Sequence, residues 1–229
     1  MHEPEPFRPL RGLAFWTCIA LGVDLFLLAG RGLSAWVQSR AASLAEFEDA
    51  ATSEAFGRAS RMLLRFQGLY FFGFVLCAVL FLCWFHRAHR NLSSFRTPPF
   101  EYTDGAAVWG FVVPIVSLVY PYWVMQEVWK GSDPSVPRDE RAPFEVLASR
   151  LARVWWAGYV SSGVVGWVRR FPIQGPAGLA RVRTLAFSTM VESALGVVAG
   201  VLCIALVLAI TKRQELCAGL PATTRPSST

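Results

Sequence analysis

Five long stretches without a charged residue constrain this chain more than any other feature of its sequence. They occupy residues 12–23, 66–85, 106–125, 154–168 and 193–211. An α-helix rises about 1.5 Å per residue, so about 20 apolar residues cross a hydrocarbon core of about 30 Å. Inside lipid each backbone amide must find its partner within its own segment, which favours helices. The alternation of a membrane β-barrel is missing from the sequence. The pattern therefore predicts an all-α integral membrane helical bundle.

The composition points to the same solvent. Of the 229 residues, 54% are hydrophobic and 17% are charged, whereas soluble domains usually contain about 45–50% apolar residues. The net charge of +6 comes from Lys and Arg residues that stand singly or in pairs at the ends of apolar stretches, as anchors and topology signals do. Because they form no continuous basic face, we expect no nucleic-acid partner. The expected partner is the lipid bilayer.

The apolar stretches also predict the domain organisation. We expect a cytoplasmic N-terminus at residues 1–11, a single polytopic membrane domain at 12–213 and a disordered tail at 214–229. Four firm transmembrane helices are predicted, at 12–37, 66–85, 154–168 and 184–211. An amphipathic helix is expected before residue 66, with Ser43 as its N-cap and Glu46 completing a capping box.

The remaining hydrophobic segment, at 106–129, contains two prolines. Pro114 and Pro121 lack an amide donor and should break or kink a helix. The segment is then either re-entrant or a fifth span. If it spans, Lys and Arg number nine on the cytoplasmic side and thirteen outside; if it re-enters, the counts are thirteen and nine. Cytoplasmic segments usually carry the excess. The counts favour re-entry, although the acid-free arginines at 169–183 favour the span.

Two acidic residues in or beside the apolar stretches are candidates for a functional or structural role. Asp24 lies near the middle of the first helix, where a carboxylate costs at least about 2.5–3.5 kcal/mol. It serves either a proton or ion relay or, as we favour, a protonated or hydrogen-bonded structural role. Glu127 ends the proline-broken segment. If that segment re-enters, Glu127 comes to the cytoplasmic interface and is expected to pair with Arg87 or Arg90 as a structural latch, with a substrate site as the alternative.

Small residues recur four apart on two of the predicted helices. In lipid, helices associate through close backbone approach, which small residues at this spacing permit. These stripes predict a compact bundle, with a homo-oligomer or a membrane-protein partner as the alternative. The residues are Gly158, Ser162, Gly166, Gly196 and Gly200.

No catalytic or cofactor-binding signature is present in the sequence. His86 and His89 share a helical face, but a zinc site needs about four ligands and no third His or Cys lies at a supporting spacing. The five cysteines show no CxxC pattern. Hydrolase, phosphate-loop and metalloprotease motifs are also missing. We therefore expect no catalytic residue, metal or cofactor.

Two motifs, WFHRAHRNL and YTDGAAVWGFVVPIVSLVYPYWVMQEVWKGSDP, stand at residues 84–92 and 102–134. They resemble the signature of the domain-of-unknown-function 4328 family of bacterial membrane proteins, and the resemblance covers about residues 10–213. The matching positions are Trp84, Arg87, Arg90, Asn91, Gly105, Pro114, Leu118, Pro121, Glu127, Trp129, Ser132, Asp133 and Pro134.

The chain departs from this family pattern at three positions. His89 stands where Arg is usual, Ala106 where Trp is usual and Ser117 where Asn is usual. The resemblance implies a helical fold and a multi-pass location in the bacterial plasma (inner) membrane, and it supplies no activity.

The residues themselves give the expected function. Arg87, Arg90 and Arg96 follow the second predicted helix without a nearby acid, which predicts a cytoplasmic N-terminus. We expect a non-enzymatic membrane scaffold or accessory subunit. The alternative is a small transporter or channel element that uses the proline-broken segment and Asp24.

Overall fold

The computed structural model describes residues 6–44, 50–94, 100–113, 116–135, 149–169 and 178–219. In these ranges the regular structure is helical and no strand occurs, as the sequence predicts. The α-helices are α1 (Arg11–Leu44), α2 (Ala50–Arg90), α3 (Ala106–Val112), α4 (Tyr120–Gly131), α5 (Arg150–Val168) and α6 (Leu179–Gly219). Two short 3₁₀ helices, η2 (Asn91–Ser94) and η3 (Val116–Leu118), lie between them.

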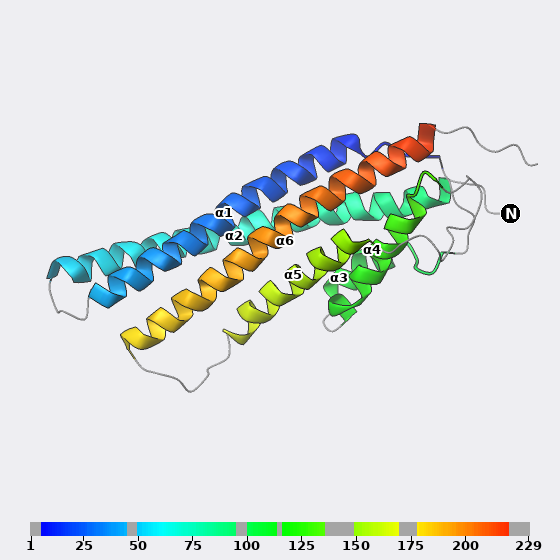
Figure 1. Cartoon of the computed structure of the whole chain (residues 1–229). Coiled ribbons are helices and arrows are strands. Elements are labelled where there is room, and N and C mark those ends of the chain that lie inside the picture. Colours follow the sequence, from blue (N-terminus) through cyan, green and yellow to red (C-terminus); the bar gives the residue numbers. More distant parts are fainter. Residues whose placement is uncertain are drawn as a thin grey trace, which may run out of the picture. The chain divides into compact units, whose positions relative to one another are not determined.

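Three helices of the described chain are long and apolar enough to cross a membrane: α1, α2 and α6. Figure 1 shows each of them as one continuous ribbon. With 34 residues in α1 and 41 in each of the others, they are about 51 Å and 62 Å long at about 1.5 Å per residue. Each is therefore longer than a hydrocarbon core of about 30 Å requires.

The prediction of four firm transmembrane helices is corrected to three. The fourth expected span is helical as α5, but it has only 19 residues and begins RLAR. With two arginines in its first turn, it is not among the described helices that are long and apolar enough to cross. The proline-broken segment does divide into separate short helices, α3, η3 and α4, with Pro121 in the first turn of α4. Proline fits there because first-turn amides have no partner within the helix.

Three predicted boundaries also differ. The amphipathic stretch before residue 66 continues directly into the apolar stretch, so that both form α2. Ser43 belongs to the last turn of α1, where its hydroxyl donates to the Ser39 carbonyl over 3.1 Å, and it is not an N-cap. Glu46 lies outside the described residues. The expected tail begins too early, because α6 continues to Gly219; residues 220–229 lie outside the described part.

The long helices contribute to two compact units. The first contains Met1–Cys18, Ala78–Arg153 and Cys203–Thr229, and the second contains Ile19–Cys77 and Val154–Leu202. In the first unit the core is aromatic. Trp84 and Phe85 are fully buried, and the Phe85 ring meets Phe111 edge to face at 5.8 Å. This aromatic packing joins the end of α2 to α3.

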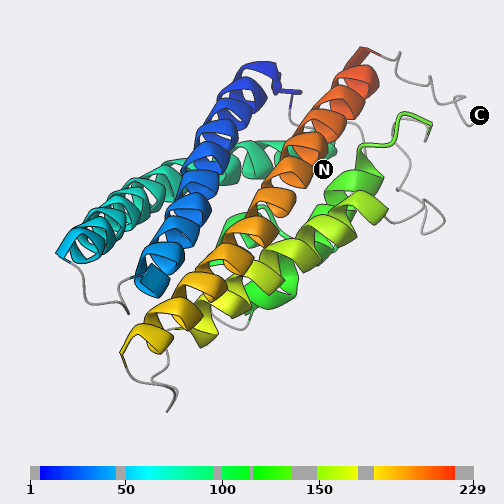
Figure 2. The same ribbon diagram turned by 60° about the vertical axis from the view of Figure 1, so that its left-hand side comes forward.

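In the second unit, glycines set the distances between helices. A Cβ on Gly158 would lie 3.4 Å from Ala199 Cβ, so α5 and α6 approach closely there, and the two helices run alongside each other in Figure 2. Cβ atoms on Gly196 and Gly200 would meet Leu28 and Leu25 of α1 at 2.6 and 2.4 Å. Gly166 packs against Glu192, whereas the Ser162 hydroxyl donates to the Tyr159 carbonyl of its own helix.

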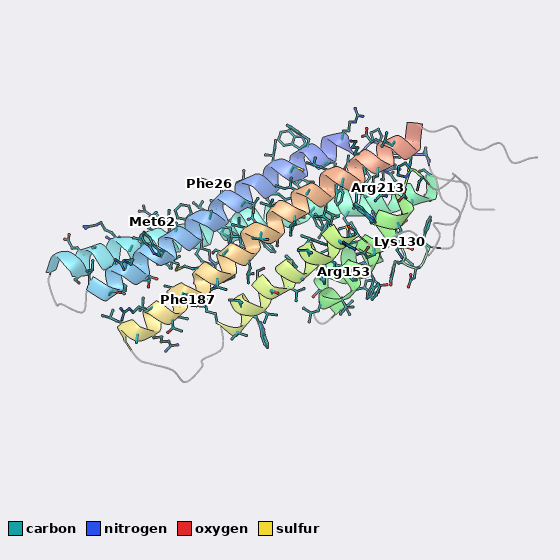
Figure 3. The ribbon with its side chains drawn as sticks, viewed as in Figure 1. Phe26, Met62, Lys130, Arg153, Phe187 and Arg213 are labelled. Carbon is teal, nitrogen blue, oxygen red and sulfur yellow. The ribbon has the colours of Figure 1, made fainter. Side chains whose placement is uncertain are left out.

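Large apolar side chains face outward along the helices. Phe26 on α1 is 71% exposed and Phe187 on α6 is 65% exposed; both are labelled in Figure 3. Phe72 on α2 is 72% exposed. Water disfavours such a surface, because each exposed aromatic side chain of this size leaves about 1.5–3 kcal/mol of burial free energy unrealised. The outward faces of these helices suit lipid.

Candidate functional site

His89 lies between the two ends of the proline-broken segment in the first unit. Its ring is 1% exposed. Nδ1 lies 2.8 Å from Asp104 Oδ1, just before α3, and Nε2 lies 3.1 Å from Glu127 Oε2 in α4. An imidazolium donates from both nitrogens and fits two carboxylate acceptors. We call His89, Asp104 and Glu127 the His89 cluster.

The His89 cluster fixes the course of the segment between its carboxylates. Asp104 and Glu127 are 23 positions apart in the chain, yet both contact one imidazole ring. The second oxygen of Glu127 accepts the Glu101 backbone N–H over 2.6 Å, which brings the start and end of the segment together a second time. Within this unit the chain therefore returns to the end of α2 from which it left. The expected basic partner of Glu127 was Arg87 or Arg90; the partner described is His89.

A second polar network joins four parts of the same unit. Asn91 Nδ2 donates to the Arg8 carbonyl over 2.9 Å and to Gln214 Oε1 over 3.2 Å. Gln214 in turn donates to the Ala88 carbonyl over 2.7 Å and to the Ser132 hydroxyl over 3.0 Å. Asn91, Gln214 and Ser132 are all at least 98% buried. Buried amides are costly unless paired, so this network fixes the ends of α2, α4 and α6 to one another.

Charged groups close the same end of the unit. Asp133, which follows α4, pairs with Arg213 of α6, and the Arg213 guanidinium also lies 4.2 Å from the centre of the Trp129 ring. Burial raises the pKa of Asp133, but hydrogen bonds from the Ser135 hydroxyl and backbone and the charge of Arg213 outweigh it, so the pKa is below 3.8. Asp133 is therefore ionised near neutral pH.

Gln126 and Ser149 define the start of α5. The Gln126 amide donates to the Ser149 carbonyl over 3.1 Å, and its oxygen accepts the Ser149 N–H over 2.7 Å. The Ser149 hydroxyl accepts the Ala152 N–H over 3.1 Å, which is N-cap geometry. Both side chains are buried. Through these bonds α4 holds the first turn of α5.

The second unit contains a polar group centred on one buried arginine, which we call the Arg31 cluster: Arg31, Gln67, Arg169 and Glu192. Arg31 is fully buried. Its Nε donates to Gln67 Oε1 over 2.7 Å, and its Nη2 lies 2.6 Å from Glu192 Oε2. The same carboxylate oxygen lies 3.3 Å from Arg169 Nη2. Two guanidinium groups therefore share one carboxylate.

Two neighbouring side chains, Tyr70 and Thr189, contact the arginines of the Arg31 cluster. The Tyr70 ring lies 5.4 Å from the Arg31 guanidinium carbon, and Arg169 Nη1 donates to the Thr189 hydroxyl over 2.7 Å. One atom of the cluster, Arg31 Nη1, is buried without a hydrogen-bond partner among the described residues. The uncharged sequence that adjoins this cluster ends at Gly30 on α1, and it begins at Phe66 on α2 and at Ser193 on α6. The cluster therefore marks one boundary of the lipid-compatible part of the unit.

Asp24 lies two helical turns from Arg31 on α1. Its Oδ1 is buried and has no hydrogen-bond partner in the described part of the chain. A Cβ on Gly73 would lie 3.3 Å from this oxygen, so the carboxyl group faces the backbone of α2. The position agrees with a polar group directed into the bundle, and it leaves open both roles considered for Asp24.

A family model for a domain of unknown function (DUF4328) matches residues 41–212, about three quarters of the chain. The chain belongs to the DUF4328 family. The resemblance seen in the two motifs is thereby confirmed. No curated protein and no solved structure matches the chain.

Most of the DUF4328 signature positions converge in the first unit. Trp84 donates from its indole N–H to the Thr211 hydroxyl over 3.1 Å. The Gly105 carbonyl accepts the Trp109 N–H over 2.9 Å at the start of α3. Pro114 lies outside the described residues. Pro121 is buried in the first turn of α4. The contacts of five further signature positions are given above: Asn91, Glu127, Trp129, Ser132 and Asp133.

Arg87, Arg90, Leu118 and Pro134 complete the DUF4328 signature. Arg87 and Arg90 are half-buried in the last turn of α2, and Leu118 is exposed at the end of η3. Pro134 stands between Asp133 and Ser135, whose N–H and hydroxyl both bond the Asp133 carboxylate. Of the departures from the DUF4328 pattern, His89 alone has described side-chain contacts.

Sequence reasoning missed several residues that build these sites. Gln214 was placed in the tail, although Leu206, Ile210 and Gln214 follow one another at four-residue spacing on α6, which could have extended the helix. Arg31 and Glu192 were not among the candidates selected from the sequence. Opposite charges at the ends of two apolar stretches were the signal available for that pair. The described residues contain no group of three His, Cys, Asp or Glu side chains placed to hold a metal.

Proposed function

We propose that this DUF4328 protein is a non-enzymatic scaffold or accessory subunit of the bacterial plasma membrane. The observation that carries the proposal is the use made of its signature side chains. Asn91, Glu127 and Asp133 each bond a residue from another part of the first unit. Groups engaged in this way position helices, whereas an active site presents convergent groups to an open pocket.

The proposed topology is re-entrant, with the N-terminus in the cytoplasm. It is supported by the His89 cluster, in which Asp104 and Glu127 meet one ring. It is also supported by charge, because re-entry places thirteen Lys and Arg residues in the cytoplasm and nine outside. In this arrangement α3, η3 and α4 enter and leave on the cytoplasmic side, and α1, α2 and α6 cross the bilayer together with the shorter α5. Four crossings keep the end of α6 on the same side as the N-terminus, in agreement with the bonds from Asn91 to Arg8 and Gln214. Backbone that is not helical is tolerated at such depth where protein covers it.

Cysteine labelling tests this topology. In a variant without the five native cysteines, Ser135→Cys should react with a membrane-impermeant maleimide only in inside-out vesicles. Ser53→Cys, in the first turns of α2, is the matched control and should react only from the outside of intact cells. Reaction of Ser135→Cys in intact cells would show that the segment spans and would reject re-entry.

Association in native membranes tests the scaffold role. A tagged chain extracted in mild detergent should migrate on native gels in a complex of fixed stoichiometry, with copies of itself or with another membrane protein. The small-residue stripes and the outward apolar faces supply surfaces for either. Migration as a single chain in lipid nanodiscs, at native expression, would contradict the proposal.

A small transporter or channel element is the second candidate. Two buried atoms without described partners, Asp24 Oδ1 and Arg31 Nη1, favour it, since ionisable residues inside a membrane often mark an ion path. In proteoliposomes this candidate requires proton or ion flux above that of empty vesicles and a reduced flux for Asp24→Asn. Flux equal to that of empty vesicles would reject transport by the chain alone.

A further inference from the structure

A groove in the second unit lies directly beside the Arg31 cluster. Its volume is about 380 Å³. The lining residues come from α1, α2, α6 and the residue after α5, and they are Gln38, Leu63, Arg169, Val182, Leu185, Ala186 and Thr189. Sites for small ligands usually measure roughly 300–1,000 Å³. The groove therefore has room for a compact polar group with a short apolar extension.

The depth of the groove follows from the sequence around it. The apolar stretches of α1, α2 and α6 end at the Arg31 cluster, where Arg31 contacts Gln67 and Glu192. Gln38, Leu63 and Val182 come from the stretches of the same helices beyond that level. Arg169 belongs to both the cluster and the groove. The groove consequently opens at the level where the helices leave hydrocarbon, which is where lipid headgroups lie.

The charge beside the groove favours an anion. Glu192 Oε2 is shared by Arg31 and Arg169, so these three groups have a net charge of +1. Asp24 lies seven residues before Arg31 on α1, which is about 10 Å along the helix axis. Gln38, the groove residue of α1, lies in the opposite direction from Arg31. A guanidinium group binds phosphate well because its planar fork matches the phosphate oxygens.

The apolar part of the lining distinguishes a lipid from a free anion. Leu63, Val182, Leu185 and Ala186 are all hydrophobic, and they border the groove beside Arg169. An inorganic phosphate would leave this surface unused, whereas the glycerol and first acyl carbons of a phospholipid would cover it. Basic pockets between membrane helices bind anionic headgroups in this way.

We propose that the groove holds an anionic phospholipid, with its phosphate at Arg169 and its glycerol and first acyl carbons on Leu63, Val182 and Leu185. The net positive charge selects a lipid that is anionic overall over a zwitterionic one. The occupant comes from the bilayer leaflet that faces this end of the unit. This inference rests on the membrane location proposed above and is independent of the scaffold role and of which side of the membrane the groove faces.

Native mass spectrometry of the full chain, with added phosphatidylglycerol or phosphatidylcholine, tests the proposal. The wild-type chain should retain phosphatidylglycerol in preference to phosphatidylcholine. Arg169→Gln should weaken phosphatidylglycerol retention at least about tenfold, because a hydrogen-bonded charge pair is lost. Arg181→Gln removes an exposed arginine in the first turn of α6 and should change retention less than twofold. Equal retention of both lipids by the wild type would overturn the proposal.

A second variant decides the case in which Arg169→Gln does not fold. Val182→Phe keeps every charge and fills the groove, so it should also lose the preference for phosphatidylglycerol. Retention unchanged in Val182→Phe would overturn the proposal. Inorganic phosphate at millimolar concentration should not displace the lipid; displacement would assign the groove to a free anion. Solubility of the chain without detergent would instead reject the membrane location itself.

Discussion

Arg31 carries a full charge in a fully buried position, and its free energy depends on the carboxylate beside it. The guanidinium bonds Gln67 and Glu192 and lies over the Tyr70 ring. A buried ion pair gains little over an apolar pair of similar volume, but removing one partner leaves a charge that burial penalises. The two partners of this pair are therefore expected to tolerate joint replacement better than single replacement.

We predict that Arg31→Gln lowers the free energy of unfolding by about 3 kcal/mol, because Glu192, which is 17% exposed, would keep Arg169 as its one described basic partner. Arg31→Gln with Glu192→Gln should recover part of that loss. Thermal unfolding in detergent micelles measures both. The matched control is Arg58→Gln, since Arg58 forms an exposed pair with Glu54 and should cost about 0.5 kcal/mol or less. Equal losses for Arg31→Gln and Arg58→Gln would contradict the prediction.

Asp133 gives a pH dependence whose sign follows from its environment. Its pKa in the folded chain is below the ordinary value of 3.8. The stabilisation from the ionised carboxylate is therefore complete above about pH 4 and is lost as the pH falls through the folded pKa. Asp133→Asn should lower the melting temperature at pH 7. It should also reduce the fall in melting temperature on acidification, because the variant has no carboxylate at this position to protonate. Between pH 5 and pH 3 the melting temperature of the wild type should fall by more than that of the variant. Equal declines would refute this account.

At the residue scale, the sequence indicated positions more reliably than partners. Asn91 and Glu127 were selected through motifs, yet their partners Gln214 and His89 were not foreseen. A motif records which residues recur along the chain, whereas a partner depends on which segments meet in space. Gln214 and Arg31 were missed for a second reason. A polar residue at the end of an apolar stretch usually faces water or headgroups, and only packing by another helix buries it.

The helices pack through positions at which a side chain is small or missing. Gly158 in α5 faces Ala199 in α6, with backbone atoms of Ala199 within 4 Å of its hypothetical Cβ. Backbone atoms cannot move away by a change of rotamer, as the end of a long side chain can. This contact therefore limits how closely α5 and α6 approach. Gly163 on the same helix has nothing within 4 Å of a hypothetical Cβ, and a side chain there would meet open space.

We predict that Gly158→Leu destabilises the chain by about 1–3 kcal/mol, as overpacking of a tight contact usually does. Gly163→Leu, the matched control, should be neutral or slightly stabilising because leucine favours helix more than glycine does. Unfolding in micelles gives both values, and amide exchange in α5 locates the change. If both variants unfold alike, close packing at Gly158 does not determine the position of α5.

At the element scale, the apolar stretches located every long helix but not its full length. Residues 66–85 are apolar, whereas α2 begins at Ala50 and ends at Arg90. Hydropathy finds the part of a helix that suits lipid, and the parts beyond it have polar faces that resemble surface segments. The break at Pro121 was foreseen because proline has a fixed backbone chemistry. The sequence favoured re-entry of the segment but did not predict that Asp104 and Glu127 meet at His89, since charge counts cannot position two carboxylates around one ring.

The molecule as a whole has an outer surface that water would not stabilise. Phe26, Leu64 and Phe72 are each at least 70% exposed, and they lie on two helices of membrane-spanning length. Contiguous apolar surface of this kind drives association in water. It is compatible with a bilayer, where lipid tails cover it.

We predict that the purified chain needs detergent or lipid to remain dispersed. On removal of detergent it should aggregate, and on transfer to lipid nanodiscs it should keep its helical circular-dichroism spectrum. Size-exclusion chromatography with light scattering distinguishes these states. A dispersed monomer in plain buffer would contradict the membrane location and every proposal that depends on it.

The lengths of α2 and α6 have a consequence for where this protein can act. Each has 41 residues, roughly twice the 20 or so that lipid demands. The surplus can place side chains some 20–30 Å from the hydrocarbon, in an aqueous compartment, while the remainder of the same rod stays embedded. A factor that never touches the bilayer could therefore dock on one end of these helices and be tethered to the membrane by the other.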